Sequence, residues 1–134
     1  MKVLGISGSP RRSGNTEILV KHALEAVEKA GLETEMISLS GKEILGCNAC
    51  MICGKREGCP IEDDLFSIYL KMKEADGIIL GSPVYFGSAP AVMKALMERA
   101  GYIARQNGDP FFGKVGGPLV VAFTAGEGAD SAPT

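Results

Sequence analysis

The sequence has few of the side chains that most often carry acid–base catalysis. It contains no tryptophan and a single histidine, His22, and only 6% of its residues are aromatic. His22 falls at the margin of the apolar face of an expected helix, so we interpret it as a boundary residue rather than a catalyst. The chemistry of the chain is therefore expected to come from other residues or from a bound group.

Charge and hydropathy exclude further classes of protein. The net charge is −2 with acidic and basic residues interspersed, which provides no basic surface for a nucleic-acid backbone. No apolar run approaches the ~20 residues of a membrane span. The N-terminal run KVLGISGSP lacks the longer apolar region and the cleavage site of a signal peptide. We expect a cytoplasmic protein with no nucleic-acid and no membrane partner.

The hydrophobic pattern predicts a single α/β domain over residues 1–134. Strands are predicted over residues 2–7, 33–39, 77–81 and 118–124. Helices are predicted between them, over residues 15–30, 64–74 and 88–103. This alternation predicts a doubly wound parallel sheet in a three-layer α/β/α arrangement. Ligands of such sheets bind beyond the carboxyl ends of the strands, so we expect the segments after the strands to share one edge.

All four cysteines lie in one short segment, residues 46–60, which we call the cysteine loop. They form a C-x₂-C-x₂-C-x₅-C motif made of Cys47, Cys50, Cys53 and Cys59. Structural disulfides are disfavoured in a reducing compartment, and zinc sites usually divide their ligands between two separated knuckles. Thiolates at two-residue gaps instead favour one compact [4Fe–4S] cluster, although zinc, a vacant site and a redox-active disulfide remain open. Asp63 or Asp64 is expected to cap the helix that follows.

The segment SGSPRRSGNT, which follows the first strand, is rich in small and hydroxyl side chains and leads into a helix N-terminus. Backbone amides and the helix dipole make such a place suitable for an anion. It matches neither the Walker loop nor the dinucleotide motif, so we expect a compact phosphate monoester. Arg11 or Arg12 is available to balance its charge. An ordinary flexible loop is the alternative.

GISGSPRRSGNT together with GSPVYFGSAPAVMKALMERA resembles the NADPH-dependent FMN reductase family of flavodoxin-like proteins. With the cysteine loop between these motifs, the chain is similar to the iron–sulfur flavoprotein branch of that family. The resemblance implies strand order 2-1-3-4-5 and FMN beside the first and third strands. By position, the residues that match the phosphate loop are Ser7, Ser9, Arg11, Asn15 and Thr16. Those that match the segment holding the flavin ring are Pro83, Val84, Tyr85, Phe86 and Gly87, and weaker matches after the fourth strand are Thr124 and Gly126.

The function that this resemblance implies is electron transfer between FMN and a [4Fe–4S] cluster. Such a protein exchanges electrons with a small carrier such as ferredoxin, or with NAD(P)H, and converts between two-electron and one-electron carriers. A first alternative is an NAD(P)H-dependent FMN or quinone reductase whose cysteine site holds zinc or is vacant. A second is a non-enzymatic metal-binding interaction module.

No segment after Thr124 is predicted to form the fifth strand of a flavodoxin-like sheet. We therefore expect an altered or truncated end, or a partner subunit that covers the open edge of the fourth strand. The resemblance also implies a homodimer or homotetramer. The apolar helix over residues 92–103, with Met93 and Met97 one turn apart, is the candidate interface, and packing within the monomer is the alternative.

Overall fold

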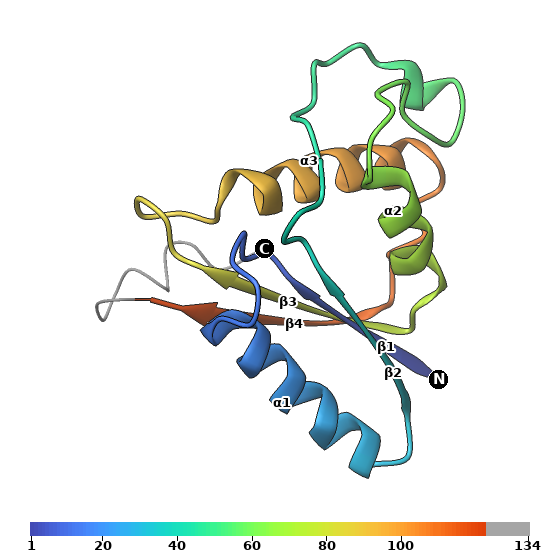
Figure 1. Cartoon of the computed structure of the whole chain (residues 1–134). Helices are drawn as coiled ribbons and strands as arrows, with labels where there is room; N and C mark the ends of the chain where they lie inside the picture. The colour runs from blue at the N-terminus through green and yellow to red at the C-terminus, as the bar shows by residue number, and fades with distance from the viewer. Residues whose placement is uncertain (123–134) are drawn as a thin grey trace.

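The computed structural model describes residues 1–122, and the weaker expectations at Thr124 and Gly126 lie outside these residues. The described chain forms a four-stranded parallel sheet of order β2-β1-β3-β4 (Figure 1). Its strands are β1 (Lys2–Ser7), β2 (Glu33–Ser38), β3 (Gly77–Pro83) and β4 (Val115–Val121). The flavodoxin-like order 2-1-3-4 and the doubly wound topology are thus confirmed, whereas the expectation about a fifth strand concerns residues beyond this range.

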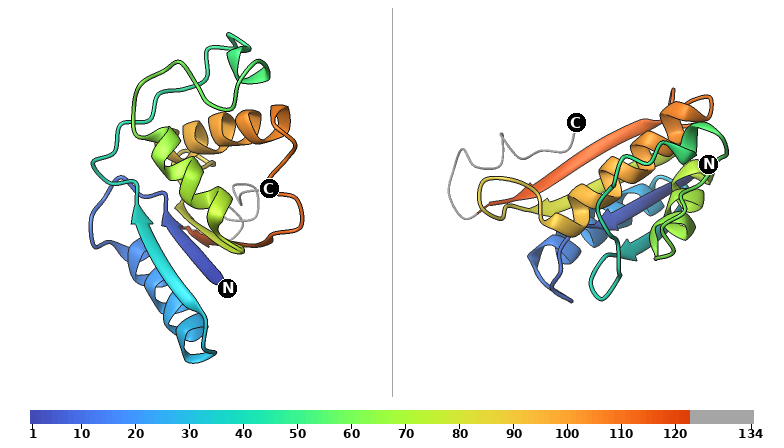
Figure 2. Two further views of the ribbon diagram at one scale, coloured as in Figure 1. Left: turned by 90° about the vertical axis from the view of Figure 1, so that its right-hand side faces the viewer. Right: turned by 90° about the horizontal axis from the view of Figure 1, so that it is seen from above.

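Helices cover both faces of the sheet, which confirms the three-layer prediction (Figures 1 and 2). Helix α1 (Asn15–Lys29) lies on one face, and α2 (Leu65–Glu74) and α3 (Ala91–Gln106) lie on the other. Gly81 of β3 lets α1 approach closely, because a Cβ atom there would lie 2.3 Å from Val20 Cγ2. No described helix is long and apolar enough to cross a bilayer.

Strand register brings the carboxyl ends of the strands together. Ser7 of β1 is paired with Ser38 of β2 on one side and with Gly81 of β3 on the other. The Gly8 amide extends this pairing by donating to the Gly81 carbonyl at 2.7 Å. The segments that leave β1 and β3 therefore start as immediate neighbours, as the topology predicts.

Helix α3 packs inward rather than presenting the methionine pair as a surface. Met93 is fully buried, with 0% of its surface exposed, and it packs against Gly8. Met97 is partly buried against the same core. The expectation that Met93 belongs to an intersubunit interface is wrong, because the face of α3 that carries it covers the sheet.

Helix α1 starts at Asn15, as its predicted range has it, whereas α3 starts three residues later than predicted. The N-cap of α1 is Gly14, and Asn15 is the first helical residue. Gly14 has no side chain that could accept a hydrogen bond. Glu17, inside the helix, accepts the backbone amide of Ser13 at 2.8 Å from Oε2 and so satisfies this donor just before the helix. Helix α3 starts after Pro90, whereas Ser88 belongs to the preceding turn.

Candidate functional site

The segment after β1, residues 8–14, forms a tight loop that ends at the N-terminus of α1. Ser7, Ser9 and Thr16 are buried, at 0%, 4% and 3% exposure, while Arg11 and Asn15 are exposed. The Ser9 hydroxyl accepts the Arg11 amide at 3.1 Å, which curls the loop. Of the five residues predicted for the phosphate group, the structure thus buries the three with hydroxyl side chains and leaves Arg11 and Asn15 at the surface.

This loop fits an anionic group. The buried Ser7 Oγ has no hydrogen-bond partner among residues 1–122. A buried hydroxyl without a partner is costly, and a ligand oxygen would satisfy it. The adjacent N-terminus of α1 adds backbone donors and a favourable dipole.

The segment after β3 forms a tight turn that projects an aromatic side chain. Tyr85 and Ser88 exchange two backbone hydrogen bonds, at 2.7 and 3.1 Å. Phe86 and Gly87 between them both have positive φ, 50° and 76°, as a type I′ turn requires. The Val84 amide donates to the Val121 carbonyl at 3.1 Å, which ties the turn to the end of β4. We call residues 83–88 the aromatic turn.

Phe86 is the most exposed large apolar side chain of the described residues, at 108%. A non-glycine residue with positive φ carries backbone strain, and an exposed phenylalanine gains nothing from the core to offset it. Such a residue is typical of a site that contacts a ligand. Together, the loop after β1 and the aromatic turn form the first half of the candidate site.

The cysteine loop does not share this edge of the sheet, which corrects the sequence-based expectation. It crosses over α3 and lies above the C-terminal half of that helix (Figures 1 and 2). Two side chains hold it there: Arg99 of α3 donates to Cys59 Sγ at 3.4 Å, and Asn107, the C-cap of α3, donates to the Cys53 carbonyl at 2.9 Å. The aromatic turn precedes the other end of α3.

All four cysteines line one mostly apolar cavity of about 240 Å³. The cavity is lined by the loop itself and by Arg99, Tyr102 and Ile103 of α3. Cys47 and Cys50 are exposed, whereas Cys53 and Cys59 are partly buried. Within residues 1–122, no group of three or more His, Cys, Asp or Glu side chains is arranged to hold a metal ion. The thiols thus surround a common space without converging on one point.

The backbone of the cysteine loop is wound tightly around this cavity. Ala49 and Met51 have φ of 59° and 65°, a conformation that costs about 1 kcal/mol or more for a residue with a Cβ. The Ala49 amide donates to Cys47 Sγ at 3.3 Å, and the one-turn helix η1 (Ile52–Gly54) follows. This winding turns successive thiols toward the common cavity, and hydrogen bonds from amides to sulfur are one way in which a protein tunes a group held by thiolates.

Arg99 is a functional candidate that sequence reasoning missed. Its side chain is only 2% exposed and pairs with Asp63, itself 1% exposed, at 2.5 Å. Burial opposes ionisation of Asp63, but hydrogen bonds from Arg99 and from the Leu45 and Leu65 amides outweigh it and lower the pKa of that carboxyl. Asp63 therefore accepts the first amide of α2 and carries a buried ion pair, whereas Asp64 holds the N-cap position without a side-chain cap hydrogen bond.

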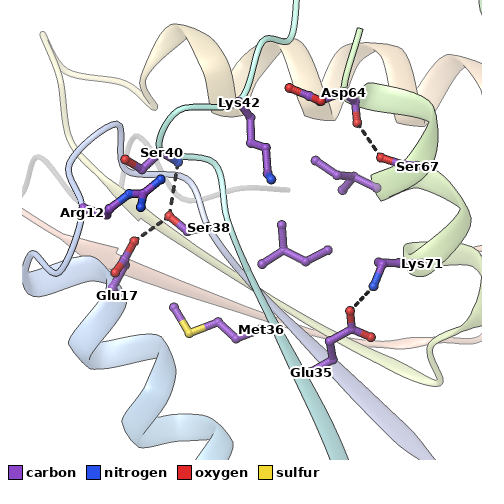
Figure 3. A pocket seen from close by; sticks show the side chains of 12 residues that line it. Arg12, Glu17, Glu35, Met36, Ser38, Ser40, Lys42, Asp64, Ser67 and Lys71 are labelled. Carbon is purple, nitrogen blue, oxygen red and sulfur yellow. Dashed lines mark hydrogen bonds and ion pairs between the residues drawn. The ribbon is translucent and has the colours of Figure 1, made fainter.

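A second, polar cavity of about 470 Å³ lies between α1, β2 and α2 (Figure 3). Its carboxylates are already paired: Glu17 accepts the Ser38 hydroxyl, and Glu35 contacts Lys2 and Lys71. The contacts from Lys2 and then Lys71 lower the pKa of Glu35. Of the residues expected near an anion, only Arg12 lines this cavity, which leaves Arg11 as the candidate at the phosphate loop.

The fold and these two loops define a flavodoxin-like α/β protein with an anion loop and a separate cysteine site. Comparison with known families agrees over nearly the whole chain. The chain belongs to the NADPH-dependent FMN reductase family, whose model matches residues 1–132, and to its iron–sulfur flavoprotein branch. Membership of this family supports a redox role as a flavoprotein.

Two curated relatives illustrate the branch. An iron–sulfur flavoprotein of Methanocaldococcus jannaschii is 50% identical over 131 residues, which cover 98% of this chain and 67% of the relative. An iron–sulfur flavoprotein of Methanosarcina thermophila is 45% identical over 107 residues, which cover 80% of this chain and 56% of the relative. The chain thus spans between about half and two thirds of the length of these relatives.

Solved structures agree on the fold. The crystal structure of RosB superposes with a TM-score of 0.72 at 24% identity, covering 91% of this chain and 52% of RosB. A flavodoxin from the domain Archaea gives a TM-score of 0.61 at 19% identity, covering 95% of this chain and 66% of the flavodoxin. Both likenesses concern the flavodoxin-like arrangement of strands and helices.

Proposed function

We propose that the chain is an electron-transfer flavoprotein that binds FMN at the carboxyl edge of β1 and β3 and a [4Fe–4S] cluster in the cysteine loop. The observation that carries the proposal is the arrangement of four cysteines around one cavity in a member of this family. The relatives named above are called iron–sulfur flavoproteins, which supports both groups. A small carrier such as ferredoxin, or NAD(P)H, is the proposed exchange partner.

For FMN, the residues present fit the phosphate end. Ser7, Ser9 and Thr16 supply buried hydroxyls, Asn15 opens the helix, and Arg11 is exposed beside them. The unpartnered Ser7 hydroxyl is the direct sign that this loop is built for another oxygen.

The aromatic turn is proposed to hold the ring of FMN. Pro83 ends β3, Val84 follows it, and the backbone of Tyr85 to Gly87 forms the turn. When bound, FMN supplies two-electron and one-electron redox chemistry. The contribution of the turn is to orient the ring and to exclude water from one of its faces.

For the cysteine loop, a cluster fits better than a single zinc ion. Structural zinc sites usually divide their four ligands between two separated pairs, and the C-x₂-C-x₂-C-x₅-C spacing of this loop does not provide two such pairs. Four thiols that line a shared cavity instead match a larger inorganic group with one thiolate at each iron. The apolar wall of the cavity limits water, which is one way a protein sets the potential of a cluster.

The two halves of the site lie along different parts of α3: the aromatic turn precedes its N-terminus, and the cysteine cavity is lined by Arg99, Tyr102 and Ile103 of its C-terminal half. We therefore include in the proposal that the chain assembles as a homodimer or homotetramer. In such an assembly, the cysteine loop of one copy can approach the aromatic turn of another. Sedimentation at several protein concentrations tests this part, and a monomer at all of them contradicts it.

The test of the function is an anaerobic purification followed by iron, sulfide, zinc and FMN analysis of one sample. The proposal requires about four irons and four sulfides per chain together with FMN. Cys53→Ser should lose the iron while FMN remains, and Lys55→Ser, an exposed change in the same loop, should lose neither. Zinc with FMN would instead establish the reductase alternative, and metal without flavin would establish the interaction module.

A further inference from the structure

Arg99 is a buried cation whose partners all belong to the base of the cysteine loop. Its Nη1 donates to the Leu45 carbonyl at 3.0 Å and to Asp63 Oδ2 at 2.5 Å. Its Nη2 donates to the Ile61 carbonyl at 3.2 Å and to Cys59 Sγ at 3.4 Å. One side chain of α3 therefore contacts the chain just before the loop and just after it.

This geometry closes the loop at its base. Leu45 precedes the first cysteine, and Ile61 and Asp63 follow the last one. A guanidinium can bridge the two flanks because its donors lie in a rigid planar fork, whereas an ammonium is a single point of charge. With Arg99 in place, the two ends of the cysteine loop are held together before any metal enters.

Arg99 also brings a positive charge to a cysteine that we assign to the cluster. The cation is 2% exposed, so solvent screens it little, and its Nε has no hydrogen-bond partner among residues 1–122. Burying an ion pair costs free energy that its Coulomb attraction often fails to repay. A buried pair placed directly against Cys59 is therefore better explained by a role at the cysteine site than by stability alone.

We propose that Arg99 is a positioning residue that holds the base of the cysteine loop closed and raises the reduction potential of the bound cluster through its contact with Cys59. The proposal rests on the proposed function, since it needs a cluster in the loop. A buried positive charge beside a thiolate favours the more negative, reduced state of the cluster. Removing the charge should make reduction harder.

The first measurement is the midpoint potential of the cluster in the whole protein, from an anaerobic redox titration followed by electron paramagnetic resonance. Arg99→Gln should lower the equilibrium constant for reduction about tenfold, which is about 59 mV for one electron. Arg99→Lys keeps the charge and should recover most of this shift. Arg105→Gln removes an exposed arginine from the same helix and should leave the potential unchanged.

The second measurement needs no cluster. Lys55 and Arg56 are exposed trypsin sites inside the cysteine loop. In the metal-free protein, Arg99→Gln should be cleaved at these two sites at least several times faster than the wild type. Arg99→Lys should also be cleaved faster, because one ammonium cannot reach both flanks, and Arg105→Gln should be cleaved at the wild-type rate.

The outcomes separate the two proposals. A wild-type protein without iron and sulfide overturns the proposed function, and with it the effect on potential, while the cleavage rates still decide whether Arg99 holds the loop. Arg99→Gln with a full cluster and a wild-type potential overturns the electrostatic role. If Arg99→Gln takes up no cluster, cleavage at the wild-type rate overturns the positioning role, and faster cleavage supports it.

Discussion

The Ser38 hydroxyl at the end of β2 donates to Glu17 Oε1 at 2.5 Å, and Glu17 Oε2 accepts the Ser13 amide. One buried carboxylate in the first turn of α1 therefore links the phosphate loop to the neighbouring strand (Figure 3). The hydrogen bond from Ser38 is the largest cause that lowers the pKa of Glu17, and it outweighs the opposing effect of burial.

Glu17→Gln should destabilise the protein in a pH-dependent way. Because the folded-state pKa is lowered, the carboxylate contributes stability above its unfolded pKa of about 4.3 and loses it as pH falls through the folded value. The unfolding free energy of the variant should lie below that of the wild type at pH 7, and the gap should narrow below about pH 4.3. Urea unfolding of both proteins at several pH values across this range measures the difference in unfolding free energy. Glu25→Gln, an exposed change in the same helix, should show no such gap.

Gly8→Ala should strain the contact between the phosphate loop and α3. An added Cβ would lie 2.9 Å from Met93 Cβ and Cγ, so the buried methionine would have to move. We expect a loss of about 1–3 kcal/mol in unfolding free energy, together with weaker FMN binding. Gly101→Ala, in α3 with no atom within 4 Å of the new methyl group, should instead stabilise the protein by about 0.5–1 kcal/mol. Equal effects of the two substitutions would contradict the packing described for Met93.

The local hydrophobic pattern of the sequence predicted the sheet well and the path of the cysteine loop poorly. The strand Lys2–Ser7 and the order of elements follow from short apolar runs alternating with helical spacing, signals that lie within a few residues. The connection between Ser38 and Leu65 has no such periodicity, apart from the short helix η1. A connection of this length has no path that local rules determine, so its position over α3 could not be predicted.

The same limit explains why the role of Arg99 was missed and why the sequence left two alternatives for the helix that carries Met93. An arginine within an apolar helix is expected to face solvent, since a charge is rarely buried without a partner. Its partner Asp63 lies 36 residues earlier, and nothing local to either residue indicates the pairing. Met93 and Met97 share a side of α3, but helical spacing alone cannot show whether that side faces the sheet or a second subunit.

Tyr69 couples α2 to the cysteine loop through a buried hydroxyl. Burial, followed by the nearby Glu57 carboxylate, which accepts its hydroxyl at 3.3 Å, raises the pKa of Tyr69 to about 12. Its ring stacks on Phe66 with centroids 5.6 Å apart. A raised folded-state pKa means that stability is fully present below the unfolded value of about 10 and is lost as pH rises toward 12.

In a near-ultraviolet pH titration, Tyr69 should form tyrosinate near pH 12, later than the exposed tyrosines. Tyr69→Phe should remove this late phase. The unfolding free energy of the variant should also fall less steeply than that of the wild type above about pH 10. Tyr102→Phe changes a tyrosine that is 48% exposed, and the late phase should persist in it. A late phase that survives in Tyr69→Phe would show that this hydroxyl is not held as described.

Phe86 and Phe112 offer a matched pair for testing the aromatic turn. Both are highly exposed, at 108% and 88%, so neither contributes much to the core. Only Phe86 lies in the turn after β3, whereas Phe112 lies in the connection between α3 and β4. Alanine at either position should change the unfolding free energy by less than about 0.5 kcal/mol.

The two alanine variants should differ in flavin affinity. An aromatic contact with a flat ring contributes about 0.5–1.5 kcal/mol, so Phe86→Ala should weaken FMN binding about two- to thirteenfold. Phe112→Ala should bind FMN as the wild type does, because Phe112 lies after the C-terminal end of α3, whereas the aromatic turn precedes its N-terminal end. Titration of flavin fluorescence against each protein measures both constants. Wild-type affinity in Phe86→Ala, or an equal loss in Phe112→Ala, would place the flavin ring elsewhere than at this turn.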